Sequence, residues 1–325
     1  MAYKCPKIEV FSGTFFKKYN KRQKNIMNVP APLFRDPIFD GPADPMVIRK
    51  ESDGMFYMFY TQRRANQQVE RVSYCYGTDI GVAESPDGVN WHYRGALDLD
   101  FEFGRNTYWA PEIVYNPDDK LYHMYVSCIV GVYTYWGGKA SIEHYTSPDL
   151  FYWKHIGSLE FGSSRIIDPC CFRLPSGKWR MWYKDEKQNA ATCYADSDDL
   201  YEWEYKGIAT SDQGQEGPNV FEFAGKYWLI ADVWTGQAVY SSDDCEHFVR
   251  QETNILSEDG TRKDDNFRGA HADVFVTGGR AFIVYFTHPD LNYRPRSAIQ
   301  MAELKVIDGV LTCDRNAEFD CDWRS

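Results

Sequence analysis

One stretch of the chain, Gly41-Pro42-Ala43-Asp44-Pro45-Met46-Val47-Ile48, sets a pattern that later segments repeat. It is an apolar run that opens with a carboxylate before proline. About nine residues after Asp44, the turn pair Asp53-Gly54 precedes a second apolar run, Met55–Tyr60. Two apolar runs separated by a glycine-containing turn are typical of a β-hairpin. The stretch therefore predicts two adjacent antiparallel strands.

The same order of opening phrase, turn and apolar run occurs four more times. The later openings are Ala110-Pro111-Glu112, Asp168-Pro169-Cys170, Glu216-Gly217-Pro218 and His271-Ala272-Asp273. The first four units continue to a Ser- and Asp-rich turn that precedes an aromatic residue. Four short antiparallel strands repeated at about 50–65 residues are the signature of a propeller blade. The sequence thus predicts an all-β fold, a five-bladed β-propeller with four-stranded antiparallel blades around a central channel.

The extent of the repeat predicts the domain organisation. We expect residues 39–325 to form a single five-bladed catalytic propeller, with Leu311-Thr312-Cys313 closing the fifth blade. Residues 1–38 fall outside the repeat, and we expect them to form an N-terminal extension that packs on the propeller or on a partner chain. The chain is expected to be a monomer or a homodimer.

Composition excludes several classes of partner. The net charge is −11, with 47 acidic and 36 basic residues, which argues against nucleic acid and anionic membranes. No run of apolar residues is long enough to span a membrane. The nine cysteines have scattered spacing and predict neither a disulfide framework nor a zinc site. We expect a cytoplasmic protein, or a periplasmic or secreted one if a leader peptide has been removed.

The blade openings predict a shared cavity, because the first strand of each propeller blade lines the channel. A lone acid before proline is most simply a turn cap, but acids at matching positions of several blades favour a common function. Three acids suit glycosidic bond cleavage, in which one activates water, one protonates the leaving oxygen and one tunes the acid. The expected ring contains Asp44, Trp109 or Glu112, Asp168, Glu216, and His271 with Asp273.

Four of these phrases carry a family resemblance. Ala43-Asp44-Pro45, Trp109-Ala110-Pro111-Glu112, Ile167-Asp168-Pro169 and Glu216-Gly217-Pro218 resemble the blade openings of glycoside hydrolase family 43 and related five-bladed propeller glycosidases, with family 117 as a nearby relative. The resemblance implies an inverting hydrolase with Asp44 as general base, Asp168 as pKa modulator and Glu216 as general acid. It implies an exo-acting enzyme for plant or algal oligosaccharides, similar to arabinofuranosidases, xylosidases or galactosidases. No cofactor is required, although His271 falls where the family often has a histidine that helps to hold a calcium ion or a water cluster, so the resemblance allows a structural calcium in the channel at His271.

Several alternatives stay open. Arg63 and Arg64 are either surface residues or, for Arg63, a pocket residue that grips an anionic group on a sugar. Family 117 relatives use a histidine as acid, so His271 rivals Glu216. A propeller glycoside phosphorylase and a non-catalytic carbohydrate-binding propeller are further candidates. We expect Trp109 and Trp234 to stack on sugar faces, and the loops 62–78, 98–108, 129–139 and 253–268 to wall the pocket.

Overall fold

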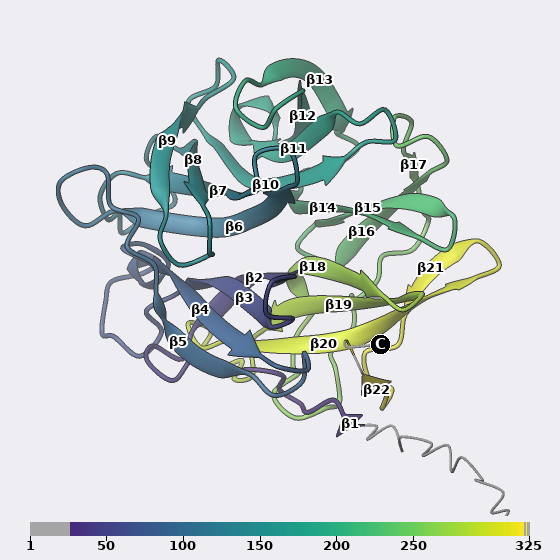
Figure 1. Ribbon diagram of the computed structural model, residues 1–325. Coiled ribbons are helices and arrows are strands. Elements are labelled where there is room, and N and C mark those ends of the chain that lie inside the picture. The colour runs from purple at the N-terminus through teal and green to yellow at the C-terminus, as the bar shows by residue number, and fades with distance from the viewer. Residues whose placement is uncertain (1–26, 322, 324–325) are drawn as a thin grey trace, which may run out of the picture.

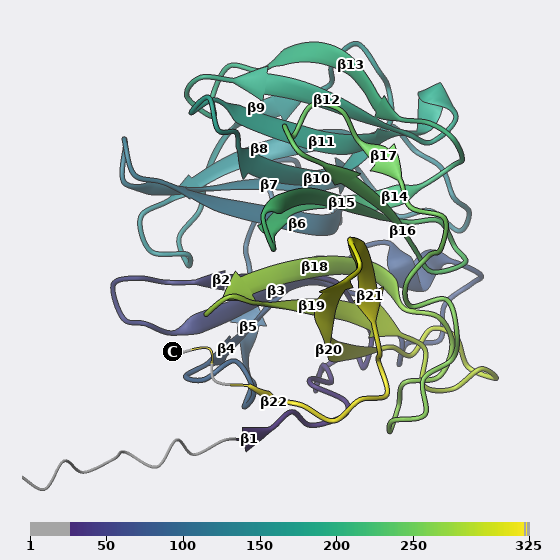
Figure 2. The same cartoon turned by 90° about the vertical axis from the view of Figure 1, so that its right-hand side faces the viewer.

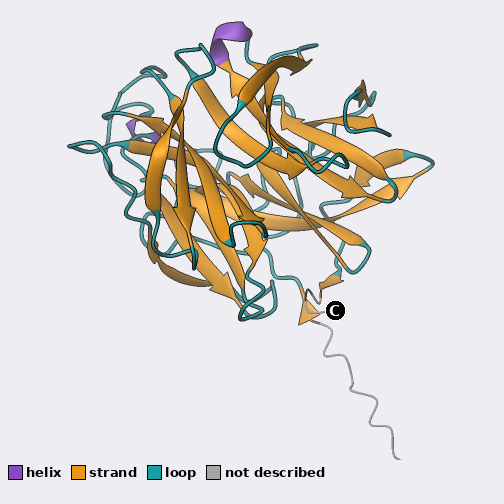
Figure 3. Cartoon of the chain, turned by 45° about the horizontal axis from the view of Figure 1, so that its top comes forward, coloured by secondary structure: helices purple, strands orange, loops and turns teal. Residues whose placement is uncertain are grey.

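The computed structural model describes residues 27–321 and 323, and strands make up nearly all of the regular secondary structure within them (Figures 1 and 3). Five four-stranded antiparallel sheets follow one another along the chain. The first three are β2–β5 (Pro42–Arg49, Phe56–Gln62, Asp79–Ser85, His92–Ala96), β6–β9 (Thr107–Asn116, Leu121–Ile129, Ser141–Ser147, Lys154–Leu159) and β10–β13 (Ile166–Arg173, Trp179–Asp185, Ala191–Ser197, Glu204–Thr210). The last two are β14–β17 (Glu216–Phe223, Lys226–Asp232, Gln237–Ser242, Val249–Arg250) and β18–β21 (Ala270–Thr277, Arg280–Thr287, Ala298–Ile307, Val310–Cys313).

The five sheets form a closed ring. The first strand of each sheet contacts the first strands of its two neighbours, and β18 contacts β2 to complete the circuit. In Figure 1 the blades can be followed around the ring, from β2–β5 through β10–β13 to β18–β21. The predicted five-bladed β-propeller is confirmed, including β21 at the segment expected to close blade five.

Apolar side chains fill the space between neighbouring blades. One buried cluster lies at each of the blade interfaces, so the core is divided into wedges rather than concentrated at the axis. The fully buried Phe59 and Met124, for example, belong to the cluster between blades one and two. This arrangement leaves the axis to the polar residues that begin the inner strands.

The ends of the described chain meet at the junction of blades five and one. Two short strands, β1 (Met27–Asn28) and β22 (Asp320–Cys321), pair with each other outside the blades (Figure 2). The backbone N–H groups of Leu33 and Phe34 donate to the carbonyl of Ile299 in β20. Leu33 and Phe34 thus lie against blade five, and the Asp36 carboxylate accepts the Tyr60 hydroxyl and the Gln62 amide of blade one. Residues 1–26 of the predicted extension lie outside the described residues.

The Ser- and Asp-rich turns have the same hydrogen bonds in four blades. Each serine hydroxyl accepts a backbone N–H three residues later at 2.9 Å, and the aspartate two residues after the serine caps the following N–H groups. The serine–aspartate pairs are Ser85–Asp87, Ser147–Asp149, Ser197–Asp199 and Ser242–Asp244. Short polar side chains favour such turns because they hydrogen-bond to the local backbone.

Every inner strand carries an irregularity near its start. The regular pairing with the second strand is interrupted after Ala43, Trp109, Ile167, Glu216 and Ala270. The residue that follows has left-handed backbone in the first four blades, with φ of 49° at Asp44, 47° at Ala110, 58° at Asp168 and 55° at Gly217. Proline follows each of these four residues and cannot donate to the sheet. A bulge of this kind redirects side chains, and here it lies at the mouth of the channel.

Candidate active site

A cavity of about 540 Å³ lies at the end of the channel where the inner strands begin. Asp44, Asp168, Glu216 and His271, which come from four blades, all line it. The other predicted site residues, Arg63, Trp109 and Trp234, line it as well. Further residues, several of them on the loops expected to wall the pocket, complete the lining: Tyr74, Cys75, Trp136, Arg165, Ile167, Lys184, Glu186, Asp232, Phe267, Arg268, Ala270, Phe286, His288 and Arg294.

Asp44 occupies the bulge of β2 and is buried, with 6% of its surface exposed. Its Oδ1 lies 3.4 Å from Nη2 of Arg63 and 3.7 Å from Nδ1 of His271. Burial lowers the pKa of Arg63, but the Asp44 carboxylate raises it, and the net result is a pKa above the ordinary value. Arg63 is therefore a permanent cation beside Asp44.

Asp168 occupies the equivalent bulge in β10. Its backbone N–H donates to the Ser127 hydroxyl at 2.9 Å, and its Oδ2 accepts the N–H of Gly217 at 3.1 Å. Burial raises the pKa of Asp168 to about 6, an effect that His271 opposes and Glu216 reinforces. This carboxyl group consequently changes charge close to neutral pH.

Glu216 lies one residue earlier in its blade than Asp44 and Asp168 do in theirs, so the expected matching of all three positions is wrong for this residue. Gly217 takes the bulged position instead. The Glu216 carboxylate accepts the indole N–H of Trp234 at 2.9 Å and pairs with Nζ of Lys184 at 3.0 Å. This indole N–H bond holds the Glu216 side chain, and the stacking of Trp234 on a sugar stays a prediction.

Asp232 is a site residue that the sequence analysis missed. It pairs with Glu216 across β14 and β15, and it accepts the backbone N–H groups of Trp234 at 2.7 Å and His271 at 3.0 Å. Burial, with the adjacent Glu216, raises the pKa of Asp232 to about 7. The charge of the nearby Glu216 carboxylate therefore favours the protonated form of Asp232.

The two arginines that follow β3 have different roles. Arg63 enters the cavity, whereas Arg64 donates to the carbonyls of Ser73 and Tyr76 at 2.7 and 2.8 Å. Arg64 thus braces its own loop. Trp109 is buried, and its indole N–H donates to the Cys75 carbonyl at 2.6 Å.

Three of the four loops expected to wall the pocket contribute lining residues, but residues 98–108 do not. That segment packs between the first two blades, where the Tyr108 hydroxyl donates to the Leu99 carbonyl at 2.9 Å. A loop that was not anticipated, between β19 and β20, supplies His288 and Arg294.

Two acids of the predicted ring lie outside the cavity lining, further along the inner strands. Glu112 accepts the N–H of Cys171 at 2.9 Å, and Asp273 accepts the N–H of Val47 at 2.8 Å. Burial raises the pKa of both carboxyl groups. These acids bind neighbouring blades together rather than facing the cavity.

The calcium expected at His271 finds no ready set of ligands. Within residues 27–321 and 323, no three His, Cys, Asp or Glu side chains are grouped as a metal site. The calcium stays a prediction, and no chemical step is routed through it. The same part of the chain contains no helix long and apolar enough to cross a membrane.

The comparison with known families decides the assignment. A family model described as a probable glycosyl hydrolase domain, related to glycoside hydrolase family 43, matches residues 38–262. The chain belongs to this family. The resemblance seen in the blade openings is thereby confirmed, and the chain is classed among the glycoside hydrolases.

Individual relatives of this family 43-related chain are distant. The arabinan endo-1,5-α-L-arabinosidase A of Aspergillus niger is 28% identical over 201 residues, which cover 58% of this chain and 56% of that protein. The matched region therefore spans little more than half of that relative's length.

Solved structures share the fold. A thermostable family 43 glycoside hydrolase aligns with a TM-score of 0.65 at 21% identity, covering 86% of this chain and 96% of the other. An exo-1,5-α-L-arabinanase from a bovine ruminal metagenomic library aligns with a TM-score of 0.61 at 19% identity, covering 86% and 99%.

Proposed function

We propose that the chain hydrolyses a glycosidic bond of a plant or algal oligosaccharide with inversion of configuration, and that it acts at chain ends. The observation that carries the proposal is the convergence of Asp44, Asp168 and Glu216, from three blades, on one cavity. Charged groups are costly to bury, so three acids brought together in this way indicate a working site.

Each acid has surroundings suited to a separate role. Asp44, beside the Arg63 cation, is the base that takes a proton from water. Glu216, oriented by Trp234, donates a proton to the leaving oxygen, and Asp232 behind it supplies a second carboxyl group with a pKa near neutrality. Asp168 is coupled electrostatically to both acids, since the charges of Glu216 and Asp44 each raise its pKa.

The walls of the cavity favour exo action. Side chains from separate loops surround it, with Tyr74 before β4, Trp136 before β8, Phe267 before β18 and Arg294 before β20. A pocket closed on several sides admits the end of a chain more readily than its middle. Arabinan-derived oligosaccharides are the first substrates to test, because the A. niger relative and the ruminal structure are both named for 1,5-α-L-arabinan.

A panel of aryl arabinofuranosides, xylosides and galactosides, with 1,5-α-arabino-oligosaccharides, tests the proposal in the presence and absence of phosphate. We expect turnover without phosphate in the wild type, and a loss of at least 10³-fold in kcat for Asp44→Asn and Glu216→Gln, with binding retained. Full activity in both variants would contradict the assignment. Binding without turnover would indicate a carbohydrate-binding propeller, and strict phosphate dependence a phosphorylase.

A further inference from the structure

Three arginines line one side of the cavity, at the junction of blades five and one. Arg63 follows β3, Arg268 precedes β18, and Arg294 lies between β19 and β20. We call this group the arginine corner. In the described part of the chain, Arg63 pairs only with Asp44, and Arg268 and Arg294 form no ion pair or side-chain hydrogen bond. The Nε atoms of Arg63 and Arg268 are buried without a partner.

Aromatic rings hold the corner in place. The guanidinium carbons of Arg268 and Arg294 lie 4.4 and 4.9 Å from the centroid of Phe267, and that of Arg63 lies 4.7 Å from the centroid of Phe286. Contact with a ring face positions a guanidinium group but leaves its N–H donors unpaired. Apart from the bond from Arg63 to Asp44, the corner therefore presents oriented donors that no acceptor in the described part of the chain satisfies.

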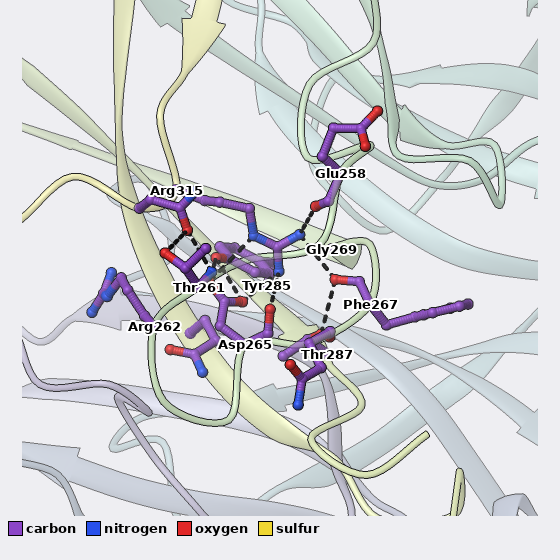
Figure 4. A network of polar contacts seen from close by, with 12 residues as sticks. Glu258, Thr261, Arg262, Asp265, Phe267, Gly269, Tyr285, Thr287 and Arg315 are labelled. Carbon is purple, nitrogen blue, oxygen red and sulfur yellow. Dashed lines mark hydrogen bonds and ion pairs between the residues drawn. The ribbon is translucent and has the colours of Figure 1, made fainter. Parts of the chain in front are cut away.

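The loop that carries Phe267 is anchored by a network of polar contacts (Figure 4). Arg315 and Asp265 form a fully buried ion pair, and Arg315 also donates to the Phe267 carbonyl at 3.0 Å. The Thr287 hydroxyl donates to the same carbonyl at 3.4 Å. These contacts hold the loop before any ligand arrives, which reduces the entropy lost on binding.

The second loop is anchored against blade one. The Tyr293 hydroxyl donates to the Ala65 carbonyl, and Arg296 pairs with Asp40 at 2.6 Å. His288 donates from Nδ1 to the Arg296 carbonyl at 3.1 Å, with its neutral ring on the cavity wall. Burial, together with Arg63 and Arg294, lowers the pKa of His288 to about 4, which agrees with a positive local potential.

The cations on the opposite wall are paired with carboxylates, so the unpaired cations of the cavity belong to the arginine corner. Lys184 pairs with Glu216 and Glu186, and Arg165 pairs with Glu186. Arg268 and Arg294 have no ion-pair partner among the described residues, so their guanidinium groups are available to an anion that enters the cavity. Forked guanidinium donors match the oxygens of carboxylate and sulfate groups.

We propose that the arginine corner binds an oxyanion carried by the sugar, either the carboxylate of a uronic acid or a sulfate ester. This inference rests on the proposed function only in placing the anion on a sugar. It extends the substrates to be tested from neutral arabino-oligosaccharides to acidic oligosaccharides, whose charged unit would lie at the arginine corner. The Arg63 guanidinium, which contacts Asp44, would link recognition of the anion to the position of the proposed base.

Calorimetric titration tests this without relying on turnover. The ligands are glucuronic and galacturonic acids, 6-sulfated glucose and galactose, the neutral sugars, and inorganic phosphate. The proteins are the wild type, Arg268→Gln/Arg294→Gln, Arg268→Lys/Arg294→Lys, and Arg94→Gln as a control arginine that pairs with Glu84 outside the pocket.

The wild type should bind an acidic sugar at least tenfold more tightly than its neutral counterpart. The glutamine pair should lose that preference, the lysine pair should keep part of it, and Arg94→Gln should keep all of it. The preferred acid distinguishes uronate from sulfate. A preference that survives in the glutamine pair, or none in the wild type, overturns the proposal, as does phosphate binding as tight as the best sugar. Arg294→Gln alone repeats the test if melting shows that the double variant is unfolded.

Discussion

The residue that most changes the view of the site is Asp232, which shares a pocket with Glu216. Because its folded-state pKa of about 7 exceeds the ordinary value, the folded protein holds a proton that the unfolded chain releases between about pH 4 and 7. Stability should fall as pH rises through that window. Between pH 5 and pH 8, the unfolding free energy of Asp232→Asn should fall less than that of the wild type, by on the order of 1–4 kcal/mol. Thermal unfolding at the two pH values measures this difference. An unchanged slope would contradict this, and Asp198→Asn, at an exposed pair, serves as control.

Lys184 tunes the acids from the opposite wall. Its ammonium group lowers the pKa of Asp168, so Lys184→Met should raise that pKa above about 6. We expect an inflection near pH 6 in the wild-type kcat/KM profile, and it should move to higher pH in the variant. Lys226→Met, which breaks a surface pair with Asp243, should leave the profile in place. If both variants match the wild-type profile, Lys184 has no such role.

The sequence repeat predicted the acids that lie at blade openings but not the acid at the end of a second strand. Asp44 and Asp168 stand out because each precedes proline at a blade opening. Asp232 ends a second strand, and its counterparts in other blades, such as Thr61 and Lys184, differ in chemistry, so only the strand pairing shows that these positions are equivalent. Arg268 and Arg294 lie on loops outside the repeat, where no pattern predicts the direction of a side chain.

Among the elements, the bulge in each inner strand determines where the site residues point, and a substitution at Gly217 tests this. Its φ of 55° is strained for other residues, and an added Cβ would lie 2.7 Å from Cγ of His271. Gly217→Ala should therefore displace His271 and lower kcat/KM about tenfold or more, in addition to a stability loss of about 1 kcal/mol from backbone strain. Gly225→Ala is a matched control, because its φ is 76° but nothing lies within 4 Å. Equal effects on kcat/KM would show that the contact with His271 is irrelevant.

The strands themselves were predictable, but the bulges were not. Glycine turns and alternating apolar runs indicate where each hairpin begins and ends. The one-residue offset of Glu216 from Asp168 depends on which residue adopts left-handed backbone, and the sequence assigns that position to Gly217 only once the pairing is known. Local patterns therefore predict elements more reliably than register.

At the scale of the whole molecule, the ring closes by packing between blades five and one rather than by a shared strand. Trp323 is fully buried there, against Phe56, Phe275 and Phe282. Trp323→Ala should lower the free energy of unfolding by about 3–5 kcal/mol, because it removes a large buried side chain. Activity measured at low temperature, where the variant is still folded, should be retained. Denaturant unfolding measures this, with the exposed Phe103→Ala as control. A loss no larger than that of the control would mean that closure lies elsewhere.

The repeat predicted the ring as a whole, because five copies of one unit allow few other architectures. It did not predict the closure, since Leu33, Phe34 and Trp323 lie outside the repeated phrases and meet only in the folded chain. Contacts that occur only once in the fold cannot be predicted from a repeated sequence pattern.

The central claim is that Asp44 and Glu216 act on opposite sides of a glycosidic bond, with water as the nucleophile. Proton NMR of the first sugar released from a hydrolysed oligosaccharide tests it most directly, because it records the anomeric configuration before mutarotation. We expect the wild type to release the inverted anomer first and Asp44→Asn to release none. Release of the retained anomer, or inversion at an undiminished rate in Asp44→Asn, would contradict it.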